Sequence, residues 1–207
     1  GSGQRELYEA VLGLRPVRNG QIHVAGRWIH RDGPRIALDA GAVGIPEDPI
    51  ADGVVPGMSV LRTLSLGRSL PTRYLRIDWS AVEGWARALP ELEALSVAAL
   101  DREVSSLSGG NIQRVFYARA LAAEAKLLVL AYPSRGLDIS TVRTGLSMVR
   151  ERCEAGVGVL MISEDLDELL AVCDRIVVLH DGEAVASVDA AGTDRRELGQ
   201  LMLGAAA

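Results

Sequence analysis

Lysine is the residue that this chain lacks most clearly. Of its 207 residues, 22 are basic, and Lys126 is the one lysine among them, so the others are arginines. A phosphate-binding loop of the Gly-Lys-Ser/Thr kind places its lysine directly after a glycine. Lys126 follows Ala125 instead. The sequence therefore contains no such loop, and any nucleotide chemistry assigned to it must do without that lysine.

Other scarcities narrow the class of protein. Aromatic residues make up 4% of the chain, so its core must be built from Leu, Val, Ala and Ile. The two cysteines, Cys153 and Cys173, are too few for a disulfide framework and suggest buried thiols in a reducing compartment. Apolar runs such as 127–132 and 157–162 are far shorter than the ~18 residues that span a bilayer. The net charge of −5 offers no attraction to nucleic acid or anionic lipid. With no signal-peptide pattern at its start, we expect a cytosolic globular domain.

The first half of the chain shows a short α/β pattern followed by a different, mostly helical one. The expected elements are a helix with Leu7, Val11 and Leu14 on one face and an end near Gly13, an alternating strand with Ile22 and Val24 inside, and a buried strand over 42–45. Residues 47–106 are richer in Pro, Arg and Leu, with helical stretches near 60–66 and 81–95 and no convincing strand. This block is predicted to be a helical insertion.

From Leu107 onward, helices and strands alternate. The expected elements are a helix from 108 to about 123, strands over 127–130, 157–162 and 176–179, helices over 140–154 and 166–172, and a hairpin strand over 183–188. This order predicts an α/β fold with a parallel sheet and right-handed crossovers. We divide the chain into a first core part (1–46), a helical subdomain (47–123), a second core part (124–190) and a C-terminal tail (191–207).

The segment Leu107-Ser108-Gly109-Gly110-Asn111, with Gln113 after it, is the most specific in the sequence. Two glycines free the backbone to approach a ligand, and a serine stands where a helix begins. Unpaired N–H groups and the positive end of the helix dipole would point outward together, which suits a phosphate. On Ser-Gly-Gly alone, a serine N-cap on an ordinary helix is the preferred interpretation.

Three further segments lead us to identify the chain as a member of the ATP-binding cassette (ABC) ATPases. Residues 107–113 and 118–121 resemble the signature motif, 127–130 and 133–138 the Walker B strand and D-loop, 159–165 the switch strand and H-loop, and 44–48 the Q-loop. The match is collinear over nearly the whole chain. It implies a P-loop NTPase (RecA-like) core with an inserted helical subdomain. Gly1, Ser2, Gly3, Gln4 and Arg5 resemble the tail of a P-loop, with the N-terminal strands missing.

Several details narrow the resemblance. Asn111, Arg135, the run 45–48 and the run 3–7 are similar to the second cassette of importers for simple sugars and nucleosides. Such ATPase subunits carry two cassettes in one polypeptide, and the second commonly has an altered P-loop. The resemblance implies a first cassette and transmembrane permease subunits as partners, no nucleic acid, and a cytoplasmic position on the inner face of the membrane.

At the catalytic positions the chain departs from the family pattern. Gln4 replaces the phosphate lysine, Arg5 the Ser/Thr that ligates Mg²⁺, Ala131 the Walker B aspartate, Tyr132 the catalytic glutamate and Glu164 the switch histidine. Glu47 stands at the Q-loop position. Two interpretations of this carboxylate stay open: the resemblance implies a contact with the membrane permease at this position, and an ordinary solvated turn explains it equally well. The signature motif and the D-loop Asp138 are intact. We therefore expect ATP with Mg²⁺ at a site shared with a partner cassette, and a degenerate site in this chain.

Two alternatives stay open at this level. The first is a non-catalytic regulatory or scaffold domain that keeps the cassette fold, and the loss of the P-loop lysine favours it. The second is an ABC ATPase that acts on DNA or ribosomes, and the lack of a basic face argues against it. His23, His30 and His180 lack ligand spacing, so we assign no metal site to the chain's own residues. The acidic group at 164–168 is typical of a solvated helix start, and only Glu164, at the switch-histidine position, is a candidate for a functional role.

Overall fold

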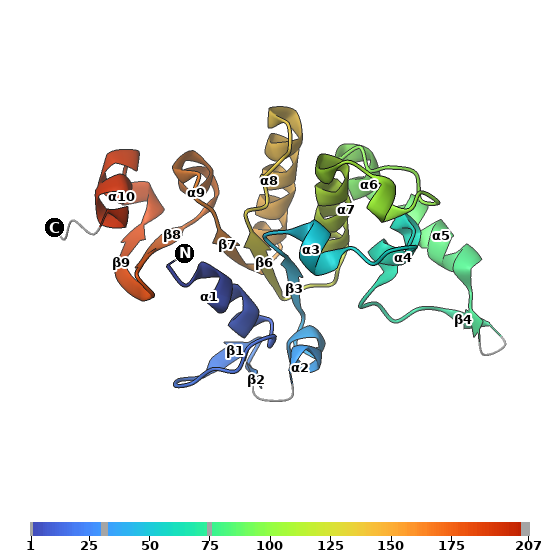
Figure 1. The fold of residues 1–207 in the computed structure, drawn as a ribbon, viewed down its shortest axis with the longest axis horizontal. Coiled ribbons are helices and arrows are strands. Elements are labelled where there is room, and N and C mark those ends of the chain that lie inside the picture. Colours follow the sequence, from blue (N-terminus) through green and yellow to red (C-terminus); the bar gives the residue numbers. More distant parts are fainter. Residues whose placement is uncertain (1, 30–32, 74–75, 204–207) are drawn as a thin grey trace.

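A computed structural model describes residues 2–29, 33–73 and 76–203 of the chain (Figure 1). Gly1, His30 and the last four residues of the predicted C-terminal tail lie outside these residues. The strands are β1 (Ile22–Val24), β2 (Arg27–Ile29), β3 (Ala42–Ile45), β4 (Thr72–Arg73), β5 (Arg76–Ile77), β6 (Leu127–Ala131), β7 (Gly158–Ile162), β8 (Arg175–His180) and β9 (Glu183–Asp189). The helices are α1 (Gln4–Val11), α2 (Pro34–Asp39), α3 (Pro49–Gly53), α4 (Val60–Ser65), α5 (Trp79–Arg87), α6 (Pro90–Ala94), α7 (Gly109–Leu121), α8 (Ile139–Glu154), α9 (Leu166–Val172) and α10 (Arg195–Met202), with the 3₁₀ turns η1 (Val104–Ser106) and η2 (Ala190–Gly192).

Strands β3, β6 and β7 form a parallel sheet in that order. The register pairs Ile45 with Leu130 and Leu130 with Met161, so the three strands end at the same edge. The predicted α/β fold with parallel strands is thereby confirmed. The segments that follow these strands begin at this one edge, which brings residues 46–48, 132–138 and 163–165 within reach of one another.

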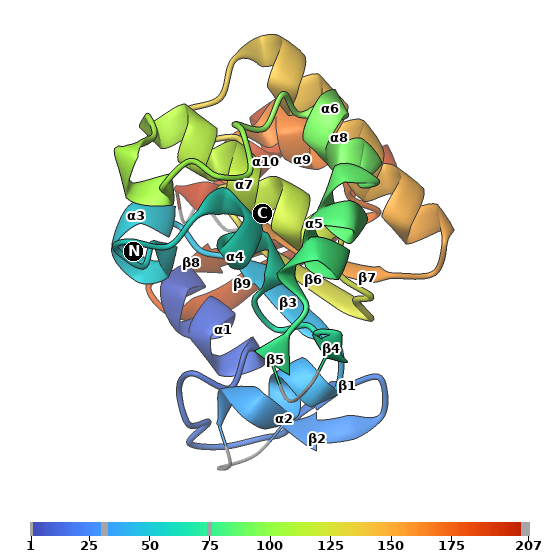
Figure 2. The same cartoon turned by 90° about the vertical axis from the view of Figure 1, so that its right-hand side faces the viewer.

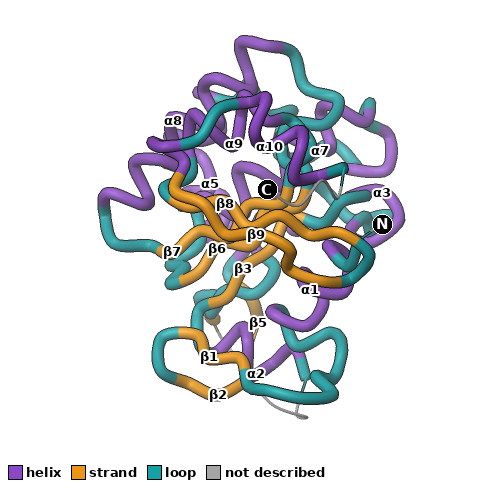
Figure 3. The backbone as a smooth tube through the Cα atoms, turned by 90° about the vertical axis from the view of Figure 1, so that its left-hand side faces the viewer, coloured by secondary structure: helices purple, strands orange, loops and turns teal. Residues whose placement is uncertain are grey.

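The hairpin β8–β9 is separate from this sheet. Within the described ranges, β7 pairs only with β6, and β8 pairs only with β9, across the turn at Asp181-Gly182 (Figure 3). We expected the strand at 176–179 to belong to the parallel sheet, and this prediction is wrong, because the strand pairs with β9 in an antiparallel hairpin. The two-residue turn favours the local antiparallel partner because closing a short loop costs little entropy.

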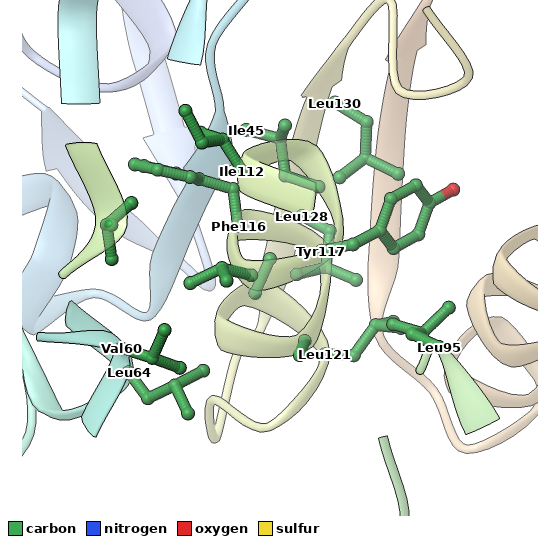
Figure 4. Close-up of a cluster of buried hydrophobic side chains, with 14 of the residues drawn as sticks. Ile45, Val60, Leu64, Leu95, Ile112, Phe116, Tyr117, Leu121, Leu128 and Leu130 are labelled. Atoms are coloured by element: carbon green, nitrogen blue, oxygen red, sulfur yellow. The ribbon is translucent and has the colours of Figure 1, made fainter. Parts of the chain in front are cut away.

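Helix α7 forms the centre of the main hydrophobic core. Its residues Phe116, Tyr117 and Leu121 are buried among Leu128 and Leu130 of β6 and, on another side, the insertion helix α4 (Figure 4). Figure 2 shows the insertion, with α4, α5 and α6, covering this side of α7. One helix therefore contacts both the sheet and the helical insertion, so the placement of its first turn depends on both.

The helices differ from the sequence-based expectation at three places, each for a physical reason. Leu7 and Leu14 are exposed while Tyr8 and Val11 are buried, because α1 ends before Leu14 and turns a different face inward. The single helix expected near 81–95 is two helices, since Pro90 has no N–H to continue α5. The third difference is an unpredicted helix: the segment assigned to a C-terminal tail contains α10, which buries Leu198 against β8 and α9, while the division of the chain itself stays a prediction.

The cysteines and the short insertion strands also differ from expectation. Cys153 lies exposed on α8 and Cys173 is half-buried; both are free thiols. The insertion contains the two-residue strands β4 and β5, too short for a periodic signal. No helix of the described residues combines the length and apolar character that crossing a membrane would require.

Two buried tyrosines predict a loss of stability at high pH. Burial raises the phenol pKa of Tyr8 and of Tyr117 above its ordinary value near 10. Unfolding releases phenols of lower pKa, so their contribution is fully present below pH ~10 and is lost as the pH rises above it. Among the described residues, the Tyr117 hydroxyl also has no hydrogen-bond partner. Urea unfolding of Tyr117→Phe should therefore show equal or higher stability at pH 7, by up to ~1 kcal/mol, and a shallower decline above pH 10. An unchanged decline would contradict the assignment; Tyr132→Phe, which removes a more exposed phenol, should make the decline shallower by less.

Candidate functional site

The first turn of α7 lies open to solvent. Ser108 is its N-cap residue, but no side chain of the described residues makes a capping hydrogen bond there, and Ser108 and Gly109 are exposed. Leu107 and Asn111 flank them, each partly buried. The N–H groups of the first turn and the positive end of the helix therefore face outward, an arrangement suited to binding phosphate.

The loop between β6 and α8 (residues 132–138, the β6–α8 loop) packs against this turn. The buried amide of Gln113 donates from Nε2 to the carbonyl oxygen of Pro133 at 2.9 Å. A Cβ atom on Gly110 would lie 2.9 Å from the carbonyl oxygen of Gly136, so only glycine fits there. The signature glycine is thus explained by its packing on the loop as well as by any ligand.

Asp138 ends this loop and begins α8. Its carboxylate accepts hydrogen bonds from the hydroxyl of Ser140, the N–H and hydroxyl of Thr141, and Arg114 Nη2 at 2.7 Å. These donors, the Ser140 hydroxyl foremost, hold the Asp138 pKa well below its usual value. The D-loop aspartate therefore caps α8 and ties it to α7, which fixes the far end of the loop.

A second group of predicted residues gathers at the carboxyl edge of the sheet. Gln4, Arg5, Glu47, Ala131 and Tyr132 all line one cavity of about 1410 Å³. The Gln4 side chain folds back and accepts the Ser2 N–H at 2.8 Å, after the left-handed Gly3. Four of the five departures and the Q-loop position Glu47 thus share one cavity, although they are far apart in the chain, whereas the fifth departure, Glu164, is not among the residues that line it.

Arg5 faces carboxylates in this cavity. Its guanidinium bonds Glu9 at 2.9 Å and lies 3.8 Å from Asp52. The hydrogen bond to Glu9, and then the charge of Asp52, raise the Arg5 pKa further. Arg5 is a permanent cation at a position where the family pattern has a hydroxyl.

Arg135 connects three of the predicted residues. Its Nη1 donates to Glu47 at 3.1 Å, its Nη2 lies 3.7 Å from Glu164, and its guanidinium stacks 4.4 Å from the centre of the Tyr132 ring. Burial, followed by the charges of Glu47 and Glu164, raises the Tyr132 pKa, so the phenol stays protonated near neutral pH. The sequence analysis named Arg135 only as a residue that resembles the family pattern. It could not predict the contacts with Glu47 and Glu164, because both residues are distant from Arg135 in the sequence.

Glu168 is a site residue that sequence reasoning missed. We expected the acidic group at 164–168 to be solvated, with only Glu164 a candidate for more. Glu168 is instead buried and accepts the hydroxyls of Ser134 at 2.5 Å and Ser163 at 2.7 Å. It therefore ties the β6–α8 loop to the end of β7. Asp165, by contrast, caps α9 as an ordinary helix start.

A helix start that faces solvent, a parallel sheet and an inserted helical layer together define a cassette-type nucleotide-binding domain. The ABC transporter family matches residues 1–134, more than half of the chain, so the chain belongs to this family. Cassettes of this family bind ATP, generally with Mg²⁺.

The relatives are ATP-binding proteins of importers. The chain is 36% identical over 190 residues to the putative ribose/galactose/methyl galactoside import ATP-binding protein 3 of Agrobacterium fabrum, covering 91% of the chain and 38% of the relative. It is 35% identical over 207 residues to the nucleoside import ATP-binding protein NupA of Lactococcus lactis, covering 99% and 41%. The chain thus spans about two fifths of the length of these curated relatives.

Solved structures agree on the fold. The ATP-binding subunit of an ABC transporter superposes with a TM-score of 0.76 at 22% identity, over 99% of this chain and 78% of that one. The dimeric bacterial ABC transporter cassette MJ0796 gives a TM-score of 0.74 at 20% identity, over 91% and 81%.

Proposed function

We propose that this chain is a cassette module that helps to couple ATP hydrolysis to the import of a sugar or nucleoside. In this role it presents its signature motif to the ATP site of a partner cassette. The observation that carries the proposal is the uncapped, exposed start of α7 at Ser108 and Gly109. Such a helix start stabilises negative charge on a phosphate supplied from outside the chain.

The chain's own nucleotide site is proposed to be degenerate. Phosphoryl transfer depends on positioned cations and on a group that orients the nucleophile. Gln4 brings no charge, Ala131 brings no carboxylate, and the phenol of Tyr132, with its raised pKa, is no base at neutral pH. Together these losses remove the parts that hydrolysis needs.

Magnesium does not fit this site. Mg²⁺ requires several oxygen ligands in near-octahedral geometry. Position 5 carries the cation Arg5, Ala131 offers no oxygen from its side chain, and the carboxylates of Glu47 and Glu164 face Arg135. The part of the chain that the structure describes holds no group of three or more His, Cys, Asp or Glu side chains placed to bind a metal. We therefore assign ATP and Mg²⁺ to a site that a partner cassette completes.

The relatives' names support the solute class and the partners. Proteins named for ribose, galactose or nucleoside import match nearly the whole chain. We infer a first cassette and membrane permease subunits as partners, and a position on the cytoplasmic face of the membrane. The dimeric cassette among the structural neighbours is consistent with a cassette partner.

An ATPase assay with three samples tests the proposal. We would compare this chain, its partner cassette, and the two joined in one polypeptide. Hydrolysis should be absent for either part alone and present in the joined protein, because only there does the exposed start of α7 face a competent phosphate site. A joined protein no faster than its partner cassette would support the scaffold alternative. Activity of this chain alone would show that its own site is competent.

A further inference from the structure

Arg135 lies where three segments of the carboxyl edge meet. Its guanidinium reaches Glu47, in the connection between β3 and the insertion, and Glu164, between β7 and α9. Its flat face covers the ring of Tyr132, which has the left-handed φ of 49°. One side chain thus links the beginning of the insertion to the ends of β6 and β7.

The same loop is held on its other side by the signature helix. Gln113 bonds Pro133, Gly110 packs on Gly136 and Arg114 bonds Asp138. Arg135 lies between these three contacts in the sequence. Any displacement of Arg135 is therefore passed to residues that touch the first turn of α7.

Charge explains why the cluster holds together. Glu47 and Glu164 lie on different segments that converge on one edge, and two carboxylates there repel each other. A planar guanidinium offers separate donors to both, which an ammonium would do less well. Both pairs are exposed, the Glu164 side chain at 76%, and each is weak by itself, so the effect depends on the two carboxylates sharing one cation.

We propose that Arg135 is a positioning residue that joins the Q-loop position, the β6–α8 loop and the H-loop position into one unit. By holding Glu47 and Glu164, it fixes the β6–α8 loop, and through the loop the first turn of α7. This inference rests on the proposed function, because it explains how a degenerate cassette keeps its signature motif ready for a partner.

Hydrogen exchange in the nucleotide-free, full-length protein that contains this chain tests the inference. The probes are the amides of Ile112, Arg135 and Leu137, each of which donates to a backbone carbonyl within the turn or loop. Arg135→Ala should speed exchange at all three by about fivefold, and Arg135→Lys by less. Arg87→Ala, which removes an exposed arginine–glutamate pair on α5, is the matched control and should leave them unchanged.

Two further arms separate the charge network from simple packing on Tyr132. Raising NaCl from 0.05 to 1 M should speed exchange in the wild type but not in Arg135→Ala, because salt screens the pairs. Glu47→Gln/Glu164→Gln should speed exchange by less than Arg135→Ala, because it also removes the repulsion between the carboxylates, and adding it to Arg135→Ala should not speed exchange further. Salt-independent exchange, or full additivity, would overturn the inference. Unchanged exchange in Arg135→Ala beside an inactive Gly109→Asp would refute the Arg135 role alone, whereas an active Gly109→Asp would refute the proposed function.

Discussion

Gly109→Asp should lower the ATPase rate of the complete two-cassette protein by about a hundredfold or more. Gly109 is the first residue of α7, and its exposed N–H group belongs to the turn that we propose faces a partner's phosphate. A carboxylate at this point opposes the negative charge that the helix start would stabilise. Losing one preorganised electrostatic contact in an active site typically costs 10²- to 10³-fold in rate, so a repulsive group should cost at least as much.

The space around Gly109 makes this test clean. A Cβ atom there would have Ile50 Cδ1 as its nearest neighbour, at 4.0 Å, so a side chain fits without strain. Gly109→Ala should therefore fold normally and retain most of the activity. Gly110→Ala is different, because its Cβ would meet the Gly136 carbonyl oxygen at 2.9 Å and push the β6–α8 loop away.

Steady-state ATP hydrolysis and a melting curve for each variant separate these cases. Gly109→Asp should be inactive with an unchanged Tm, whereas Gly110→Ala should lose both activity and stability. Gln4→Lys should change the rate little, since Ala131 and Tyr132 still leave the chain's own site incomplete. Full activity in Gly109→Asp would show that this helix start serves no phosphate.

The secondary structure was most predictable where the hydrophobic periodicity agreed with residues that begin or end helices and strands. Helix α9 begins and ends as expected, and β6, β7 and α8 differ by a residue or so at their ends, because apolar runs are bounded there by glycine, proline or a capping aspartate. The pairing of β8 could not be read in the same way. A strand's partners depend on which edges are free in space, and a sequence pattern reports only the strand itself.

The candidate site likewise has residues that the sequence could predict and contacts that it could not. The motif resemblance predicted that Gln4, Glu47, Ala131 and Tyr132 belong together, and the shared cavity is consistent with that grouping. Neither the pairing of Arg135 with Glu47, 88 residues away, nor the burial of Glu168 has a local sequence signal. Both contacts arise only because the strands β3, β6 and β7 end at one edge. Side chains that meet across such an edge are fixed by the register of the sheet.

A buried ion pair that joins the insertion to the core gives the largest expected effect on stability. Glu91 on α6 is 1% exposed, and its Oε1 accepts from Arg152 Nη2 of α8 at 2.7 Å. Its other oxygen, Oε2, is buried and has no hydrogen-bond partner in the part of the chain that the structure describes. Arg152→Ala would leave a buried carboxylate with no counter-charge. We expect a loss of about 3 kcal/mol, below the upper range for buried pairs because the Arg152 side chain is 40% exposed.

The two partners should not be equivalent, and this asymmetry identifies the mechanism. Glu91→Leu removes the buried charge and leaves an arginine that can turn to water, so its cost should stay within about 1 kcal/mol. Glu91→Leu/Arg152→Met should be as stable as the wild type or more so. Thermal unfolding measures the difference: Arg152→Ala should lower Tm by about 6–12 °C, and Glu91→Leu by no more than about 4 °C. Equal losses in both single variants would mean that the pair stabilises the protein by attraction. The larger loss in Arg152→Ala would show instead that Arg152 mainly serves to make the burial of Glu91 tolerable where α6 meets the core.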